Sequence, residues 1–379
     1  MHLIWGNYPS LFGVEKINRL ARQVSVCPTW RHLIKGPMAK TTNNLWDTII
    51  NFETLYLSFQ EAQKGKRYNP EIMKFKRNLE ENLINIQNHL IWGSWTPGRW
   101  RRFVVMEPKR RVIDAPPFAD RVVHHALVDT ILPIFEKKFI DHSYACRSGF
   151  GFHAAANRVQ KMLRKARRSN PNVYVLKADI SKYFQSVSHR VVMNIIRRTI
   201  RDTKVLSLFD TIIRAGGSDG VGIPVGALTS QLLANVYLDQ LDHYAMDTLG
   251  IGAYCRYMDD FIIVSNDKKY LWNALGKLDR YINENLELKL NPKTAIFPAP
   301  HGVDFCGYRI WSTHILPRKR TVIKARRRLK HLSKLCGDGK ISLSKFRETV
   351  MSFLGYMKHC NGYHSSLKIL SESIITRKK

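Results

Sequence analysis

The 379-residue sequence contains no apolar run near 18 residues, which argues against a membrane-spanning helix. Residues 1–9 lack the apolar segment of a secretory signal, and we find no basic amphipathic segment or lipidation signal. The six cysteines include no Cys-x-x-Cys pair, so neither a zinc site nor a disulfide framework is indicated. The sequence therefore predicts a cytoplasmic protein with reduced thiols and no membrane partner.

Acidic residues are also scarce, with 30 Asp and Glu against 61 Lys and Arg, which gives a formal net charge of +31. This excess is larger than solubility requires, and it indicates a polyanionic partner such as a nucleic acid. A hydrophobic fraction of 44% is enough for a large core divided among two or three subdomains. Strands mixed with helices along the chain favour an α+β core with helical additions at both ends.

Hydrophobic periodicity and turn residues place the elements coarsely. We expect helices over 45–59, 70–90, 121–132, 228–244, 271–286 and 343–357. We expect strands within 101–114 and over 171–179, 252–256, 261–264 and 303–310, and a Gly-rich loop over 216–226.

The segment Tyr257-Met-Asp-Asp260 places two adjacent carboxylates between two apolar, strand-like runs. The Asp pair is therefore predicted to lie in a tight β-hairpin turn, where Asp is favoured. Adjacent carboxylates repel each other unless a positive charge lies beside them. The predicted counter-charge is a pair of divalent cations, which lie about 3.5–4 Å apart in enzymes of phosphoryl transfer. A solvated Asp-Asp turn is the alternative.

A nucleotidyl transferase of this type needs a third carboxylate on a neighbouring strand, and Asp179 at the end of a buried-type strand is the best candidate. Phe184 follows five residues later, an offset at which a ring can lie under the sugar of a nucleotide and exclude a 2′-hydroxyl. Alone, this spacing is equally consistent with a core Phe. Its combination with the downstream Asp pair makes the pattern specific.

In this order the motifs resemble those of reverse transcriptases from about residue 42 to the C-terminus. They are most similar to those of bacterial diversity-generating retroelements, to which defence-associated and group II intron enzymes are related. Besides Asp179-Ile-Ser-Lys-Tyr-Phe184 and Tyr257-Met-Asp-Asp260, the resemblance rests on Asn44-Leu-Trp-Asp47, Glu107-Pro-Lys-Arg-Arg111, Asp120-Arg-Val-Val-His-His-Ala126, Ser143-Tyr-Ala-Cys-Arg147, Gly222-Ile-Pro-Val-Gly-Ala-Leu-Thr-Ser-Gln231, Asn291-Pro-Lys293 and Val303-Asp-Phe-Cys-Gly-Tyr-Arg309.

The resemblance implies a right-hand polymerase of the α+β class, with fingers, an antiparallel palm sheet and a helical thumb. The expected division is an N-terminal extension over 1–41, N-terminal helices and fingers over 42–178, the palm with part of the fingers over 179–312, and the thumb over 313–379.

The resemblance also implies roles for individual residues. Asp179, Asp259 and Asp260 are the expected catalytic residues and ligands of two Mg²⁺ ions, with Mn²⁺ as the alternative and the Ile180 carbonyl as a further ligand. The expected nucleotide-binding residues are Lys109, Arg110, Arg111, Phe184, Val225, Gly226 and Lys293. The segment Phe305-Cys306-Gly307-Tyr308 matches the primer-gripping hairpin of the family. The expected primer- and template-binding residues are Phe305, Gly307, Tyr308, Arg318, Lys319, Arg320, Lys324, Arg326, Arg327, Arg328 and Lys330.

Val225 departs from most related cellular reverse transcriptases, which carry Gln before the Gly of this motif. Diversity-generating enzymes carry an aliphatic residue there and end the motif with Ser-Gln, as in Ser230-Gln231. In that family the change accompanies misincorporation opposite template adenine. The alternative is a Val that packs against the palm without an effect on fidelity.

Three functions are therefore compared. The first is an error-prone diversity-generating reverse transcriptase, which implies a structured template RNA, cDNA and RNA–DNA duplex, dNTPs and a small basic accessory protein. The second is a bacterial or phage-encoded defence enzyme that copies a non-coding RNA and works with a second defence subunit. The third is an inactive RNA-binding protein on the same fold, against which the three retained aspartates argue.

Overall fold

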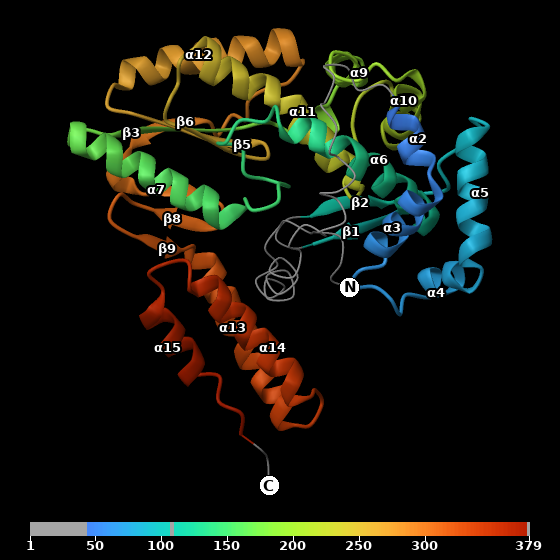
Figure 1. The fold of residues 1–379 in the computed structure, drawn as a ribbon. Helices are drawn as coiled ribbons and strands as arrows, with labels where there is room; N and C mark the ends of the chain where they lie inside the picture. The colour runs from blue at the N-terminus through green and yellow to red at the C-terminus, as the bar shows by residue number, and fades with distance from the viewer. Residues whose placement is uncertain (1–43, 107–109, 377–379) are drawn as a thin grey trace.

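The structure is a computed structural model that describes residues 44–106 and 110–376. Within these ranges helices combine with three antiparallel sheets, in the strand orders β1-β2, β4-β5-β3-β6 and β7-β8-β9. Figure 1 shows the four-stranded sheet between helices, the N-terminal helices beside it and the last three helices extending away from it. The expected α+β fold with an antiparallel central sheet is confirmed.

The N-terminal helices pack around one long central helix, α6 (Phe118–Glu136). They are α2 (Leu45–Ile50), α3 (Phe52–Ala62), α4 (Pro70–Arg77) and α5 (Leu79–Ile91). Each of the two helices predicted here is in fact two helices. Asn51 has extended backbone angles and its side chain accepts from Glu53 N, so α3 starts anew with its own cap. Asn78 separates α4 from α5 by its non-helical backbone angles, φ −120° and ψ 55°, without a side-chain cap bond.

The fingers hairpin consists of β1 (Arg101–Val105) and β2 (Arg111–Ala115), which pair antiparallel from Arg101↔Ala115 to Val105↔Arg111. This agrees with the strand prediction for 101–114. Lys109 was expected to bind the triphosphate and lies outside the described residues, as do the N-terminal residues 1–43.

The palm sheet is formed by β3 (Tyr174–Asp179), β4 (Tyr254–Tyr257), β5 (Asp260–Ser265) and β6 (Ala295–Pro298). Successive side chains of a strand point to opposite faces, and here both faces are buried. Leu176 and Ile263 belong to the core shared with α11 (Leu228–His243) and α12 (Lys268–Leu286). Val175 and Ile262 belong to the core shared with α7 (Phe152–Ser169). Burial on both faces explains the continuous apolar run in β5.

Three short helices connect β3 with α11, namely α8 (Tyr183–Ser186), α9 (His189–Arg197) and α10 (Thr203–Gly216). The sequence pattern predicted none of these three helices. It predicted only the Gly-rich loop that follows α10. Within the described ranges, no helix is long and apolar enough to cross a bilayer.

The third sheet consists of β7 (Val303–Phe305), β8 (Tyr308–Ile310) and β9 (Ile315–Pro317). The coarse prediction of one strand over 303–310 is wrong, because Cys306 and Gly307 form a two-residue turn with φ values of 50° and 83°. The hairpin that the resemblance implies at Phe305-Cys306-Gly307-Tyr308 is present. The expected palm–thumb boundary at 312 falls between β8 and β9, which pair in one sheet. The helices that follow are α13 (Lys319–Gly337), α14 (Leu343–Met357) and α15 (Tyr363–Ser371), which pack on one another.

Candidate active site

The two adjacent aspartates lie in the hairpin between β4 and β5, as predicted. Tyr257 pairs with Asp260, which leaves Met258 and Asp259 as the two loop residues. Met258 adopts a left-handed conformation with φ 56°, which is uncommon for a residue with a long side chain. Met258 is nevertheless buried, so the turn is held by its surroundings.

Asp179 lies directly beside this turn because β3 is the neighbour of β5. The register pairs Asp179 with Asp260, and Ile180 N donates to the Asp259 carbonyl at 3.2 Å. The three aspartates predicted from two motifs about 80 residues apart are therefore brought together by one pair of hydrogen-bonded strands. The Ile180 backbone lies beside them, as its expected role requires.

The electrostatics of the site disfavour three negative charges without a cation. Burial, followed by the neighbouring charge of Asp179, raises the pKa of Asp259 to about 7. Burial also raises the pKa of Asp260 to about 7, although Lys177 acts in the opposite direction with its Nζ 3.4 Å from Asp260 Oδ2. The other oxygen, Asp260 Oδ1, is buried without a hydrogen-bond partner.

The donors at this site fit a divalent cation that also binds substrate. In the described part of the chain, no group of three or more His, Cys, Asp or Glu side chains is arranged to hold a metal ion by itself. Instead, Asp179 Oδ2 accepts from Asn291 Nδ2 at 3.0 Å, and Asp260 faces Lys177. Mg²⁺ is commonly held by one or two carboxylates together with waters and substrate phosphates rather than by an all-protein cage. The unpartnered Asp260 Oδ1 and the raised carboxylate pKa values match such a site.

The Gly-rich loop connects the aspartates with the fingers hairpin. Ile223 N donates to the Phe184 carbonyl at 2.8 Å, so the loop fixes the backbone of the expected sugar gate. Asp114 N of β2 donates to the Val225 carbonyl at 3.0 Å. A Cβ on Gly226, which has φ 132°, would lie 2.8 Å from the Asp114 carbonyl oxygen, so only Gly allows this approach.

Comparison with known proteins identifies the family. The reverse transcriptase (RNA-dependent DNA polymerase) family matches residues 106–310, which is more than half of the chain. The chain belongs to the reverse transcriptase family. Family membership assigns it to the RNA-directed DNA polymerases, and enzymes of this family generally use divalent metal ions.

Individual relatives resemble this reverse transcriptase over different lengths. Protein YkfC of Escherichia coli K12 is 28% identical over 274 residues, which cover 61% of this chain and 72% of YkfC. The group II intron-encoded protein LtrA of Lactococcus lactis is 27% identical over 177 residues, which cover 44% of this chain but only 28% of LtrA. A structure of telomerase from Candida tropicalis with a TWJ fragment of telomeric RNA covers 76% of this chain and 59% of its own, with 12% identity and a TM-score of 0.48.

The remaining nucleotide-binding candidates of this reverse transcriptase lie at the β1–β2 hairpin and in the loop before β6. Arg110 is exposed and Arg111 begins β2, on the strand that carries Asp114. Lys293 is exposed in the loop that Asn291 anchors, where Asn291 N donates to the Asp179 carbonyl at 2.7 Å and Asn291 Oδ1 accepts from Lys293 N. The motif around Lys293 is therefore attached to Asp179. Whether these cations contact a triphosphate stays a prediction.

Two expected primer contacts need correction. The side chains of Phe305 and Tyr308 are fully buried, so these rings fill the core and do not face a primer. Tyr308 stacks on Tyr356 of α14 with ring centroids 5.0 Å apart, and Tyr356 Oη donates to the Gly307 carbonyl at 2.8 Å. The rings therefore attach the hairpin to the thumb, and its partly exposed part is the turn Cys306-Gly307.

The basic residues of the thumb are not equivalent. Arg326 forms a two-bond ion pair with Glu372, and Arg318 pairs with Asp304 of β7. Each of these two cations therefore already has an acidic partner from another element, and whether they contact phosphates stays a prediction. The expected residues that the structure leaves exposed without a described ion pair are Lys319, Arg320, Arg327 and Lys330. Lys324 and Arg328 are partly buried on the same helix.

Sequence reasoning missed two residues that contact the aspartates and a third, Arg256, that bonds to the carbonyl of Met258 in their turn. Lys177 faces Asp260 from the same face of β3 as Asp179, a position that the period of two could have revealed. Asn291 was quoted as part of a motif, but its bond to Asp179 depends on a chain crossing that no local pattern reports. Arg256 was read only as part of a strand, and its role depends on burial beneath the turn.

Proposed function

We propose that this reverse transcriptase copies a dedicated template RNA into cDNA by two-metal nucleotidyl transfer, as the error-prone polymerase of a diversity-generating retroelement. The observation that carries the transfer chemistry is the register that aligns Asp179 with the Asp259–Asp260 turn. A third carboxylate at this place has no structural use, because burial and mutual repulsion raise the pKa of Asp259 to about 7.

In this proposal Asp179, Asp259, Asp260 and the Ile180 carbonyl hold two Mg²⁺ ions, or Mn²⁺. Bound divalent cations stabilise the attacking and leaving oxygens of the displacement. The side chains of the fingers, Lys109, Arg110 and Arg111, and Lys293 hold the triphosphate through fixed positive charge. Phe184 acts as the sugar gate in this proposal, which is supported by the bond from the Gly-rich loop to the Phe184 carbonyl in α8.

The error-prone part of the proposal is supported by the position of Val225. Its carbonyl accepts from Asp114 N of β2, the strand that begins with Arg111, so Val225 lies where the Gly-rich loop meets the β1–β2 hairpin. An aliphatic side chain cannot donate the hydrogen bond that the amide of Gln would offer a nascent base pair. One such hydrogen bond contributes about 1–3 kcal/mol to the discrimination between correct and incorrect nucleotides. Its loss therefore raises the error rate without stopping synthesis.

Deep sequencing of cDNA copied from a defined RNA tests this proposal. The wild type should misincorporate opposite adenine more often than opposite the other bases, and Val225→Gln should reduce this bias. Val225→Ile is the matched control, because it keeps an aliphatic side chain and should keep the bias. A wild-type enzyme that copies all four bases with equal accuracy contradicts the diversity-generating role and favours the defence role.

The proposed partners are a structured RNA, the RNA–DNA duplex formed during synthesis, dNTPs and a small basic accessory protein, all in the bacterial cytoplasm. The net charge of +31 and the exposed cations of the thumb support the nucleic acid partners. Sequencing the RNA and cDNA that co-purify with the protein tests them. Recovery of cDNA from one RNA species supports a dedicated template, whereas unrelated cellular RNAs contradict it.

A further inference from the structure

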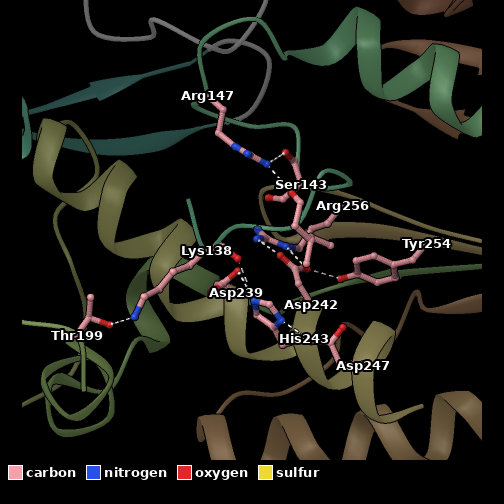
Figure 2. Close-up of polar contacts among 11 residues, drawn as sticks. Lys138, Ser143, Arg147, Thr199, Asp239, Asp242, His243, Asp247, Tyr254 and Arg256 are labelled. Atoms are coloured by element: carbon pink, nitrogen blue, oxygen red, sulfur yellow. Dashed lines mark hydrogen bonds and ion pairs between the residues drawn. The ribbon is translucent and has the colours of Figure 1, made fainter. Parts of the chain in front are cut away.

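A fully buried ion pair lies directly beneath the catalytic hairpin. Arg256 of β4 and Asp242 near the end of α11 both have side chains with 0% exposure. Arg256 Nε donates to Asp242 Oδ1 at 2.7 Å and Nη2 donates to Oδ2 at 2.5 Å, and Tyr254 Oη donates to the same carboxylate at 2.7 Å. Figure 2 shows Arg256 and Tyr254 reaching Asp242 from different directions.

The guanidinium has a third contact, which leads to the active site. Arg256 Nη1 donates at 2.9 Å to the carbonyl of Met258, the residue with φ 56° that directly precedes Asp259. A planar guanidinium presents its donors in a fixed fork, so binding two of them to Asp242 also fixes the direction of the remaining one. The position of the Met258 carbonyl is therefore tied to α11.

The backbone of Arg256 is fixed as well. Arg256 N donates to the His142 carbonyl at 2.9 Å, and Tyr144 N donates to the Arg256 carbonyl at 3.0 Å. Neither end of the side chain can shift without breaking these bonds. A buried ion pair is a poor source of net stability, because desolvation offsets most of the attraction. The presence of this pair in the core is therefore better explained by a role other than stabilising the fold.

We propose that Arg256 is a positioning residue, which uses Asp242 as a fixed support to hold the Met258 carbonyl and so sets the place of Asp259 and Asp260 relative to Asp179. This inference rests on the proposed roles of the three aspartates. Residues that orient metal ligands without binding the metal themselves matter for the site: replacing one lowers metal affinity or activity by about 10- to 100-fold. Arg256 acts through the backbone of the turn and touches no substrate.

The test compares Arg256→Lys with Tyr254→Phe, its matched control. Lys keeps the charge opposite Asp242, but one ammonium cannot replace the three fixed contacts of the guanidinium. Tyr254→Phe removes a bond to the same carboxylate without touching the turn. The readouts are the Mg²⁺ concentration that half-saturates primer extension, Mn²⁺ affinity of the protein without nucleic acid by electron paramagnetic resonance, and the melting temperature.

Arg256→Lys should raise the half-saturating Mg²⁺ concentration and weaken Mn²⁺ binding by about 10-fold or more, whereas Tyr254→Phe should change either by less than about twofold. Equal effects of the two variants on metal binding would overturn the proposal, because the pair would then act through stability alone. A wild type that binds Mn²⁺ but synthesises no DNA would instead contradict the proposed function and leave the metal-binding comparison valid.

A second variant covers the case in which Arg256→Lys does not fold. Combining Asp242→Leu, Tyr254→Phe and Arg256→Met removes every charge and hydroxyl of the network together, an exchange that buried ion pairs often tolerate. We expect a melting temperature close to that of the wild type, with the same weakened metal binding as in Arg256→Lys. Normal metal binding in this variant, or failure of both variants to fold, would reject the positioning role.

Discussion

Asp259→Asn should make the metal-free protein more stable while it abolishes DNA synthesis. The pKa of Asp259 rises from its ordinary 3.8 to about 7 because the carboxylate is buried beside Asp179. A raised pKa of this kind makes the ionised carboxylate less favourable in the folded state than in the unfolded state by an energy on the order of a few kcal/mol, which is shared with the neighbouring carboxylate of Asp179. Asn keeps the shape and the burial of a polar group, so we expect a gain of about 2–4 kcal/mol at pH 8.

The sign of the pH dependence follows from the raised pKa. Between about pH 4 and pH 7 the folded state binds more protons at Asp259 than the unfolded state, so the stability of the wild type falls as the pH rises through this range. Asp260 contributes in the same direction, since its pKa is also raised to about 7. Asp259→Asn removes one of these contributions, so its advantage should shrink as the pH falls toward 4.

Urea unfolding in EDTA at pH 5 and pH 8, followed by circular dichroism, measures this effect. Asp47→Asn is the control, because Asp47 is exposed and its replacement should change the free energy of unfolding by less than about 0.5 kcal/mol. Mg²⁺ should stabilise the wild type by about 2.7 kcal/mol at 100 times its dissociation constant, and the variant by less. A variant that is no more stable than the wild type at pH 8, or that extends primers normally, would refute the reasoning.

Four further substitutions test other parts of the protein. Phe184→Ala should admit ribonucleotides in primer extension, and an unchanged preference for dNTPs would make Phe184 a core residue only. Arg327→Gln should lower the salt-dependence slope of template–primer binding by about 0.7–0.9, whereas Arg326→Gln should lower it less because Arg326 already pairs with Glu372; equal slopes would contradict this ranking. Gly226→Ala should destabilise the protein by about 1–3 kcal/mol, since its Cβ meets a carbonyl of β2 at a positive φ, and an unchanged denaturation midpoint would show that the loop can move away.

The helix predictions succeeded where one hydrophobic period continued and failed where a cap interrupted it. The period through Leu45, Ile49 and Phe52 passes across Asn51, although Asn followed by an acidic residue two positions later is a local signal for a new helix. The segment 303–310 was read as one strand, although its buried apolar residues change phase across the turn of Cys306 and Gly307, from Val303 and Phe305 to Tyr308 and Ile310. Side-chain pattern alone does not report the sign of φ.

The sequence by itself determined the hairpin that carries Asp259 and Asp260, the α+β class and the family, because each depends on local order. Two carboxylates between apolar strands form a turn wherever the chain places them, and the motifs keep their order along the sequence. Tertiary structure alone decided which cations remain for a nucleic acid and which are neutralised. Arg326 and Glu372 are 46 residues apart, and they meet only because α13 and α15 pack on each other.

The aspartates themselves could be predicted from the sequence, whereas the residues that hold them in place could not. Two short segments of sequence identify the three aspartates, but burial raises the pKa of Asp259 and of Asp260, and residues on other elements hold the carboxylates in place. Asp242 reaches Arg256 because α11 covers the sheet, and Asn291 reaches Asp179 from the loop before β6. Such contacts follow from the packing of whole elements, which depends on the sum of many weak interactions and leaves no spacing or motif in the sequence.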